Sequence, residues 1–455
     1  MKRKLVTEIY GLAWPVLIAQ WAMMAYSVLD TVITGRYATE DLAAVGIGTS
    51  IYISVFMALM GVLIALSPTV AQLRGAGRQH EIGEQVRQAM WLAVALAALS
   101  MLIFAYPDPL LALSQVSPSL EAKVRSYLSF AAWGAPAGLG FRLFASYTTA
   151  VSLPRIVMTL TMLGLTIKAP LTWLLVVGAW GAPELGASGC ALATTLTNYV
   201  VCAAAWAWCA YAPAYRPHAV FARWSWPRLH DLRHLVTLGI PIGMTFLVDV
   251  TAFTFMALFI ARLGAINSAA HHLAGNVGAI MFMVPMATGT AVTVVVGQAI
   301  GARDFARARL AGITGIACAV VVAAVMGAVL WVTASDVARL YTSDAAVGAM
   351  AAGLFLLVAV YHVFDAAQVV TLNALRGYKR VVVPLAVTAT ALWGVGLAGG
   401  YVLGLTRAMD LSALGLTLPM GTPGFWLAAI IGMAASTLGL IVYFLRVSAT
   451  HHAEG

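Results

Sequence analysis

The feature that most constrains this chain is a series of apolar segments, each about 18 residues or longer, that recur along its whole length between short polar turns. A helix of about 20 apolar residues crosses the roughly 30 Å hydrocarbon core of a bilayer. Only 9% of the 455 residues are charged, whereas a soluble protein carries about 25%. The sequence therefore predicts an integral membrane protein without a sizeable soluble domain.

We predict twelve transmembrane helices in an all-α fold. They lie near residues 12–35, 46–69, 90–107, 124–148, 157–179, 187–211, 236–261, 270–296, 311–333, 346–374, 381–405 and 424–445. Most Lys and Arg residues between spans fall in the even-numbered gaps or near the termini, among them Arg376, Lys379 and Arg380 after the tenth span. Because cytoplasmic loops carry the excess of Lys and Arg, we expect both termini in the cytoplasm. The charged start lacks a small-residue cleavage site, so we expect it to remain uncleaved.

An internal repeat divides the chain. An offset of 226 residues aligns Pro15 with Pro241, Gln72 with Gln298, Gly75 with Gly301 and Ala76 with Ala302. We therefore predict two six-helix bundles, 1–211 and 236–455, joined by a cytoplasmic linker, 212–235. An even number of spans in each repeat gives both bundles the same orientation. They are then related by a pseudo-two-fold axis along the membrane normal, with a cavity between them.

Asp365 lies inside the tenth span, in the stretch YHVFDAAQVV that begins at Tyr361. At 100° per residue, Tyr361, Asp365 and Gln368 share one helical face, flanked by His362 and Asn373. A charged side chain at the bilayer centre costs roughly 2.5 to 3.5 kcal/mol, so this face cannot contact lipid. The pattern indicates an ion-handling or proton-handling carboxylate; the alternative is a group that only hydrogen-bonds between helices.

Of the seventeen acids, only Asp30 and Asp249 also lie well inside spans. Asp30 has hydroxyl residues on its face that suit a cation's oxygen shell. Asp249 has aromatic and Met neighbours, which suit a bulky apolar cation, although each apolar neighbour alone also fits ordinary helix packing. We expect substrate to contact Asp249, Asp365, Phe246, Phe253, Met256 and Gln368.

Two basic residues also lie within predicted spans. Arg142 is near a helix end, where a long side chain reaches the interface. Lys168 lies deeper and needs an acidic partner or must be neutral. We predict that Lys168 pairs with Asp30.

Other chemistries find little support. The chain has no GxxxxGK[ST] phosphate loop and no HExxH motif, so we expect no enzyme activity, no cofactor, and energy from an ion gradient. The net charge of +9 follows from topology and does not indicate nucleic-acid binding. The four cysteines lack metal-site spacing, and His271 with His272 fits a solvated helix end better than a pH sensor.

The chain resembles the multidrug and toxic compound extrusion (MATE) family, in its NorM-like bacterial branch, over essentially its whole length. The resemblance rests on VLDTVITGR around Asp30, PTVAQLRGAGR ending at Arg78, VVVGQAIGARD ending at Asp304, and FDAAQVV with LRGYK ending at Lys379. It implies two six-helix bundles around a V-shaped cavity and export of amphipathic, mostly cationic compounds in exchange for Na+ or H+. It also implies that Asp30, Asp365 and Tyr361 match the family's cation-site residues.

Two departures from the family pattern affect the expected site. Asp249 stands where this branch usually has Glu. The fifth-helix pattern of relatives resembles two Asn residues flanking a Pro, whereas in this chain Lys168 and Thr172 flank Pro170. We therefore expect coupling at Asp249 and Asp365, with Na+, if it is the coupling ion, bound at Asp365, Asp249 and Tyr361. Asp30 is expected to be paired internally.

Other transport classes remain as alternatives. A flippase for lipid-linked saccharides shares the general architecture but should present several basic side chains to a pyrophosphate. A channel should have a filter-like loop, and a major-facilitator transporter also has six plus six helices. The sequence leaves open the coupling ion, the compounds exported and the oligomeric state, for which we expect a monomer in the bacterial inner membrane.

Overall fold

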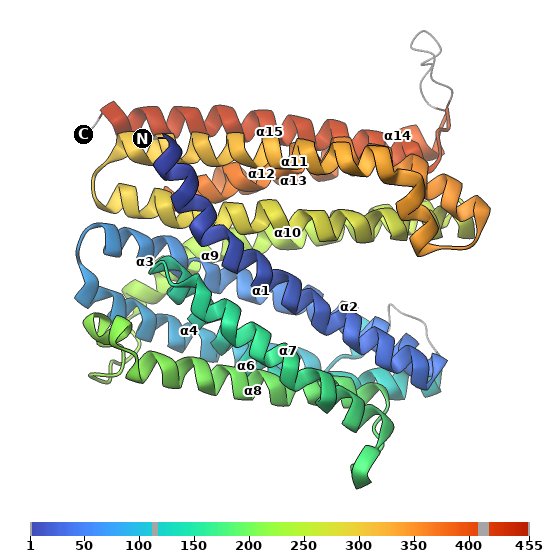
Figure 1. Ribbon diagram of the computed structural model, residues 1–455, viewed down its shortest axis with the longest axis horizontal. Coiled ribbons are helices and arrows are strands. Elements are labelled where there is room, and N and C mark those ends of the chain that lie inside the picture. The colour runs from blue at the N-terminus through green and yellow to red at the C-terminus, as the bar shows by residue number, and fades with distance from the viewer. Residues whose placement is uncertain (1, 112–116, 408–417, 454–455) are drawn as a thin grey trace. The chain divides into compact units, whose positions relative to one another are not determined.

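The computed structural model describes residues 2–111, 117–407 and 418–453, and these residues form helices joined by short connections (Figure 1). The long helices are α1 Lys2–Tyr37, α2 Thr39–Ile64, α3 Leu66–Gly75, α4 Gln79–Ala105, α6 Pro118–Ala150, α7 Pro154–Val177, α8 Ala187–Tyr211, α9 Leu229–Ala261, α10 Ala265–Gly301, α11 Phe305–Tyr341, α12 Ala345–Gly377 and α15 Thr422–Ala453. The segment between α12 and α15 is α13 Val382–Ala389, the π-helix η3 Thr390–Leu397 and α14 Ala398–Leu405. The short elements are α5 Asp108–Leu111, η1 Ala179–Gly181 and η2 Pro213–His218.

The helices confirm the predicted fold class. Eleven helices in the described ranges are long and apolar enough to cross a membrane, counting α2 with α3 and α13 with α14 as single spans. The remaining predicted span, 124–148, lies in α6, which has 33 residues and bears Lys123, Arg125 and Arg142. The all-α, multi-pass membrane architecture is therefore as the apolar segments predict.

Contacts divide the chain into two compact units. One contains Ile18–Gly243 and the other contains Met1–Leu17 with Met244–Gly455. The unit boundaries fall inside α1 and α9, in each case two residues after a proline within the helix, Pro15 or Pro241. These prolines are also the first aligned pair of the repeat. We keep the bundle and linker limits 1–211, 212–235 and 236–455 as a prediction about the repeat.

The repeat is visible in the turns that end matching helices. After α3, Ala76 N donates to Gln72 O and Arg78 N donates to Leu73 O. After α10, the same bonds run from Ala302 N to Gln298 O and from Asp304 N to Ala299 O. The residue between them has positive φ in both turns, 72° at Gly77 and 60° at Arg303. The aligned sequences therefore fold into the same local structure.

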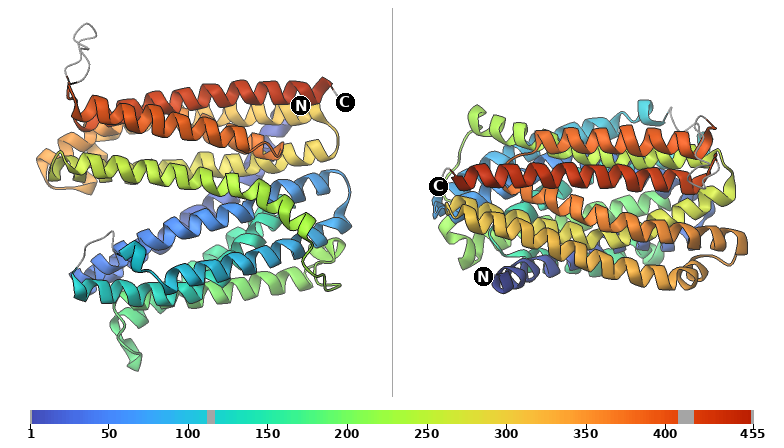
Figure 2. Two further views of the ribbon diagram at one scale, coloured as in Figure 1. Left: turned by 180° about the vertical axis from the view of Figure 1, so that it is seen from behind. Right: turned by 90° about the horizontal axis from the view of Figure 1, so that it is seen from above.

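In the C-terminal unit, α12 lies among α10, α11 and α15 (Figures 1 and 2). Nearly every residue from Asp365 to Gly377 is buried, because helices cover this part of α12 on several sides. Close approaches require small residues: a Cβ on Gly432 of α15 would lie 2.8 Å from Ala391 O in the π-helix. The first turns of α1 add Leu5 and Ile9 to this unit's core.

In the N-terminal unit, α6 packs against α2, α4 and α8. The segment after α8 is fastened to α4, since Arg87 donates to the carbonyls of Ala219 and Val220 at 2.9 Å each. His218 in this segment is buried, and its Nδ1 lies 2.5 Å from the Tyr147 hydroxyl oxygen.

Candidate functional site

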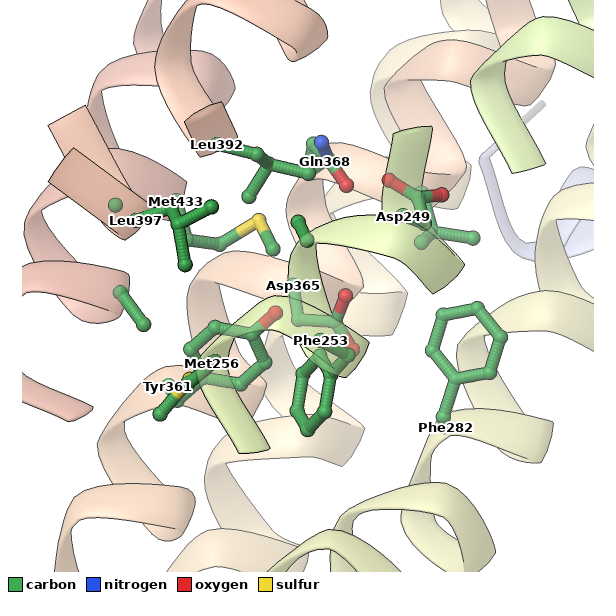
Figure 3. A pocket seen from close by; sticks show the side chains of 14 residues that line it. Asp249, Phe253, Met256, Phe282, Tyr361, Asp365, Gln368, Leu392, Leu397 and Met433 are labelled. Carbon is green, nitrogen blue, oxygen red and sulfur yellow. The ribbon is translucent and has the colours of Figure 1, made fainter. Parts of the chain in front are cut away.

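A pocket inside the C-terminal unit gathers most of the predicted site residues (Figure 3). Its open space is about 60 Å³. It is lined by Asp249, Ala252, Phe253 and Met256 of α9, Phe282 of α10, Tyr361, Asp365, Gln368 and Val369 of α12, Leu392, Gly396 and Leu397 of the π-helix, and Ala429 and Met433 of α15. Five segments therefore build one small, mainly apolar chamber around two carboxyl groups.

The two acids come from facing helices. Asp249 projects from α9 and Asp365 from α12 in Figure 3, and their carboxylates are close enough to interact electrostatically. Tyr361 lines the same pocket as both acids. Asp365 is only 7% exposed, so its charge cannot be solvated by bulk water. Asp249 is partly exposed, and two carboxylates in one small apolar pocket repel each other unless a proton or cation is present.

Helical periodicity explains how α12 delivers its polar groups. Tyr361, Asp365 and Gln368 are spaced four and three residues apart and point to the same side, as the sequence predicts. Gln368 is held in place because its Nε2 donates to Ser436 Oγ of α15 at 3.1 Å. The π-helix contributes Leu392, Gly396 and Leu397 to the pocket wall.

Phe246 does not line this pocket, although the sequence grouped it with Phe253 and Met256. Its ring instead lies against the guanidinium of Arg376, with 5.4 Å between the Arg376 Cζ atom and the ring centroid. The expectation that Arg376 lies in a turn after the tenth span is wrong, because α12 continues through it to Gly377. Arg376 is 5% exposed, because α10 packs along α12 and the Phe246 ring of α9 lies against the guanidinium.

Aromatic rings and histidines form a layer beside the pocket. His271 stacks on Phe253 with ring centroids 6.1 Å apart and lies 5.8 Å from Trp426, which also contacts Tyr361. The expectation that His271 lies at a solvated helix end is wrong, since it is 3% exposed. His272, the next residue, is exposed. α10 begins six residues before His271, so the ring already faces the interior of the unit.

In the N-terminal unit, Lys168 and Asp30 form the predicted contact. The ammonium Nζ donates to both carboxylate oxygens of Asp30 at 2.8 Å and to Thr194 Oγ1 at 2.6 Å. Lys168 has no exposed surface. Thr172 is buried as well, and its hydroxyl oxygen has no partner among the described residues. The Lys168 ammonium is therefore held against Asp30, the only acid that the sequence places deep within a span of this half.

The polar groups that line the acid pocket are two carboxyl groups, a phenol and an amide, beside the thioethers of Met256 and Met433. Among the described residues, no three His, Cys, Asp or Glu side chains cluster to hold a metal ion. Carboxylates, a phenol and an amide carbonyl are hard ligands. The pocket therefore suits Na+ or a proton better than a transition metal.

Comparison with known proteins identifies the family. The model of the MatE family matches residues 15–174 and 241–402, one match in each repeat. The chain belongs to the MatE family. The probable multidrug resistance protein NorM of Aromatoleum aromaticum is 42% identical over 96% of this chain and 92% of its own. The multidrug resistance protein PmpM of Pseudomonas aeruginosa is 36% identical over 96% and 91%.

A solved structure shows the same fold. The Vibrio cholerae MATE transporter VcmN, crystallised in a bent form, aligns with a TM-score of 0.87, covering 99% of each chain at 17% identity. The family match and the relatives named NorM confirm the resemblance to MATE proteins of the NorM-like branch. The two MatE matches begin at the first repeat proline, Pro15, and at Pro241, so the family model follows the same repeat as the sequence.

Proposed function

We propose that this MatE protein is a multidrug efflux transporter that exports amphipathic, mostly cationic compounds in exchange for Na+ or H+. One observation carries the proposal: two carboxylates, Asp249 and Asp365, share an apolar pocket with Tyr361 inside a membrane-spanning unit. The names of the relatives NorM and PmpM as multidrug resistance proteins support the substrate class.

The size of the pocket indicates what it holds in this conformation. One water needs about 10 to 15 Å³, whereas drug-sized ligands occupy pockets of roughly 300 to 1,000 Å³. A space of about 60 Å³ therefore fits a small cation with a few waters. A drug requires these walls to move apart. Because all of them belong to the C-terminal unit, alternating access must include movement of helices within that unit.

The drug and the coupling ion compete for the same two acids, and this competition couples export of the drug to import of the ion. Ionised Asp249 and Asp365 attract a cationic drug while Phe253 and Met256 cover its apolar part. On the outer side, Na+ or H+ neutralises the acids, which weakens the hold on the drug. The ion-loaded pocket then returns inward because a neutral site crosses the membrane interior at less cost.

The pocket lining disfavours the flippase alternative. A pyrophosphate-linked lipid needs basic side chains, and the residues that line this pocket include two acids and no Lys or Arg. We place the protein in the bacterial inner membrane as a monomer, with both termini in the cytoplasm as the distribution of Lys and Arg predicts.

The test is efflux of ethidium from membrane vesicles with an imposed Na+ gradient in one set and an imposed pH gradient in another. We expect efflux under one gradient and its loss in Asp365→Asn. Asp336→Asn is the matched control, because Asp336 is an exposed acid on α11 that pairs with Arg339. Normal efflux from well-folded Asp365→Asn protein would refute the proposal, and absence of efflux under either gradient would favour a lipid substrate.

A further inference from the structure

Arg376 is a buried cation next to the acid pocket that the efflux scheme above does not use. Its guanidinium lies over the Phe246 ring, and its Nη1 donates to Asn373 Oδ1 at 3.3 Å. Its Nε is buried without a hydrogen-bond partner among the described residues. Such an arrangement is costly, since burying a charge that is incompletely paired destabilises a fold. A role in function would account for it.

The contacts of Arg376 fix it in place. Asn373 accepts from Thr293 Oγ1 of α10 at its backbone oxygen, 2.8 Å away, and donates through Nδ2 to Val369 O at 2.9 Å. The guanidinium is therefore held between α9, α10 and α12. It cannot leave for solvent without breaking these contacts.

Of the two acids in the pocket, Asp249 is the one on which the charge of the Arg376 guanidinium acts. Phe246, which the guanidinium covers, precedes Asp249 by three residues on α9, so their side chains are neighbours on one helical face. The Arg376 guanidinium lies on the Phe246 ring, so it packs against the α9 face that carries Asp249, although the described residues show no direct ion pair between the two. Asp365 faces His362, whose Nδ1 lies 3.9 Å from Asp365 Oδ2. The two acids of the pocket are therefore not equivalent.

The other titratable groups around the pocket add no second positive charge. His362 of α12 and His271 of α10 each bury one ring nitrogen without a partner among the described residues. Protonating either ring would bury an unpaired donor with its charge, so both are neutral. Tyr361 is a neutral phenol. Ionised Asp249 and Asp365 with cationic Arg376 therefore give the site a net charge of minus one.

We propose that Arg376 is a positioning residue that acts as the fixed counter-charge of Asp249 and limits exchange to one coupling ion for each monovalent cation. The inference rests on the antiport proposed above. A site with a net charge of minus one is neutralised by one monocation, either the drug or the ion. Exchange of one for the other moves no net charge across the membrane.

Removing Arg376 leaves a net charge of minus two, which needs two coupling ions. The test uses purified protein in liposomes, ethidium as the monovalent probe, fixed Na+ and pH gradients, and a membrane potential set with K+ and valinomycin. The wild-type protein should reach a dye gradient that does not depend on the potential. In Arg376→Gln, each cycle moves one net charge, and the final dye ratio should change about fifty-fold per 100 mV.

Three variants separate this role from a structural one. Arg376→Lys keeps the charge and should remain insensitive to potential, as should Arg380→Gln, an exposed arginine four residues further on. If Arg376→Gln does not fold, the double variant Asp249→Asn with Arg376→Gln restores the net charge of minus one. It should fold and melt within a few degrees of the wild-type protein, because no uncompensated charge remains buried. Its readout is the melting temperature in detergent and not transport, since Asp249 belongs to the proposed coupling site.

Four results would overturn the inference: potential-dependent exchange by the wild-type protein or by Arg376→Lys, a folded Arg376→Gln protein that stays insensitive to potential, and a double variant as unstable as Arg376→Gln. An Arg376→Gln protein that transports more slowly but stays insensitive to potential counts as the third of these results. Absence of ethidium flux in the wild-type protein under either gradient is a different result. It refutes the antiport itself, and this inference with it.

Discussion

Replacing Lys168 with Met should destabilise the N-terminal unit more than any surface charge substitution does. Lys168 has no exposed surface and Asp30 is 6% exposed, so Lys168→Met leaves a buried carboxylate whose nearest compensating charge is gone. Breaking one side of a buried ion pair costs about 3 to 5 kcal/mol. The loss of the bond to Thr194 adds to this.

The double variant Asp30→Asn with Lys168→Met tests the cause. It removes both charges together, and replacing a buried pair by neutral groups of similar volume is often neutral or stabilising. We therefore expect its stability within about 1 kcal/mol of the wild type. Arg125→Met is the control, since Arg125 pairs with Asp108 and Glu121 at the surface and is 43% exposed, where a pair contributes about 0 to 1 kcal/mol.

The assay is the temperature at which half of the detergent-solubilised protein is lost from the monodisperse peak in size-exclusion chromatography. For a unit of this size, 1 kcal/mol shifts a melting temperature by about 2 to 4 °C, so Lys168→Met should melt roughly 10 °C lower. An unchanged melting temperature for Lys168→Met, or a double variant as unstable as the single one, would refute the reasoning.

Two further predictions concern the packing of each unit. Burial lowers the pKa of His218 from its ordinary value of 6.5 to about 4; between these values the unfolded chain binds a proton that the folded chain does not, so stability falls as pH drops through this window. Melting curves of His218→Gln should lose that dependence and those of exposed His230→Gln should keep it. On α10, a Cβ at Gly289 would lie 2.7 Å from Asn373 Nδ2, so Gly289→Ala should cost about 1 to 3 kcal/mol. Gly278→Ala, whose Cβ would meet its nearest neighbour at 3.9 Å, should be neutral or slightly stabilising; equal melting temperatures for the two alanine variants would contradict the steric argument.

The sequence determined the helices and their repeat. A segment in hydrocarbon must satisfy its own backbone hydrogen bonds, so apolar length alone specifies helices. Every predicted span lies on one helix or on consecutive helices to within two residues at its ends. The turn after α3 and the turn after α10 depend on local backbone bonding, which is why matching residues such as Gln72 and Gln298 predict matching geometry. Asp365 is also readable from sequence, because a carboxylate within an apolar span needs a function or a partner.

Only the tertiary structure decided which side chains share a site. Counting along the sequence placed Arg376 in a loop and His271 at a solvated helix end, yet neighbouring helices bury both side chains. Burial depends on which other segments pack over a residue and not on its distance from a helix end. The pocket wall from the π-helix and α15, including Leu392 and Met433, leaves no periodic signal in those segments that points to Asp365. Periodicity gives the face of one helix, whereas the charge balance of the pocket is set by side chains from several helices.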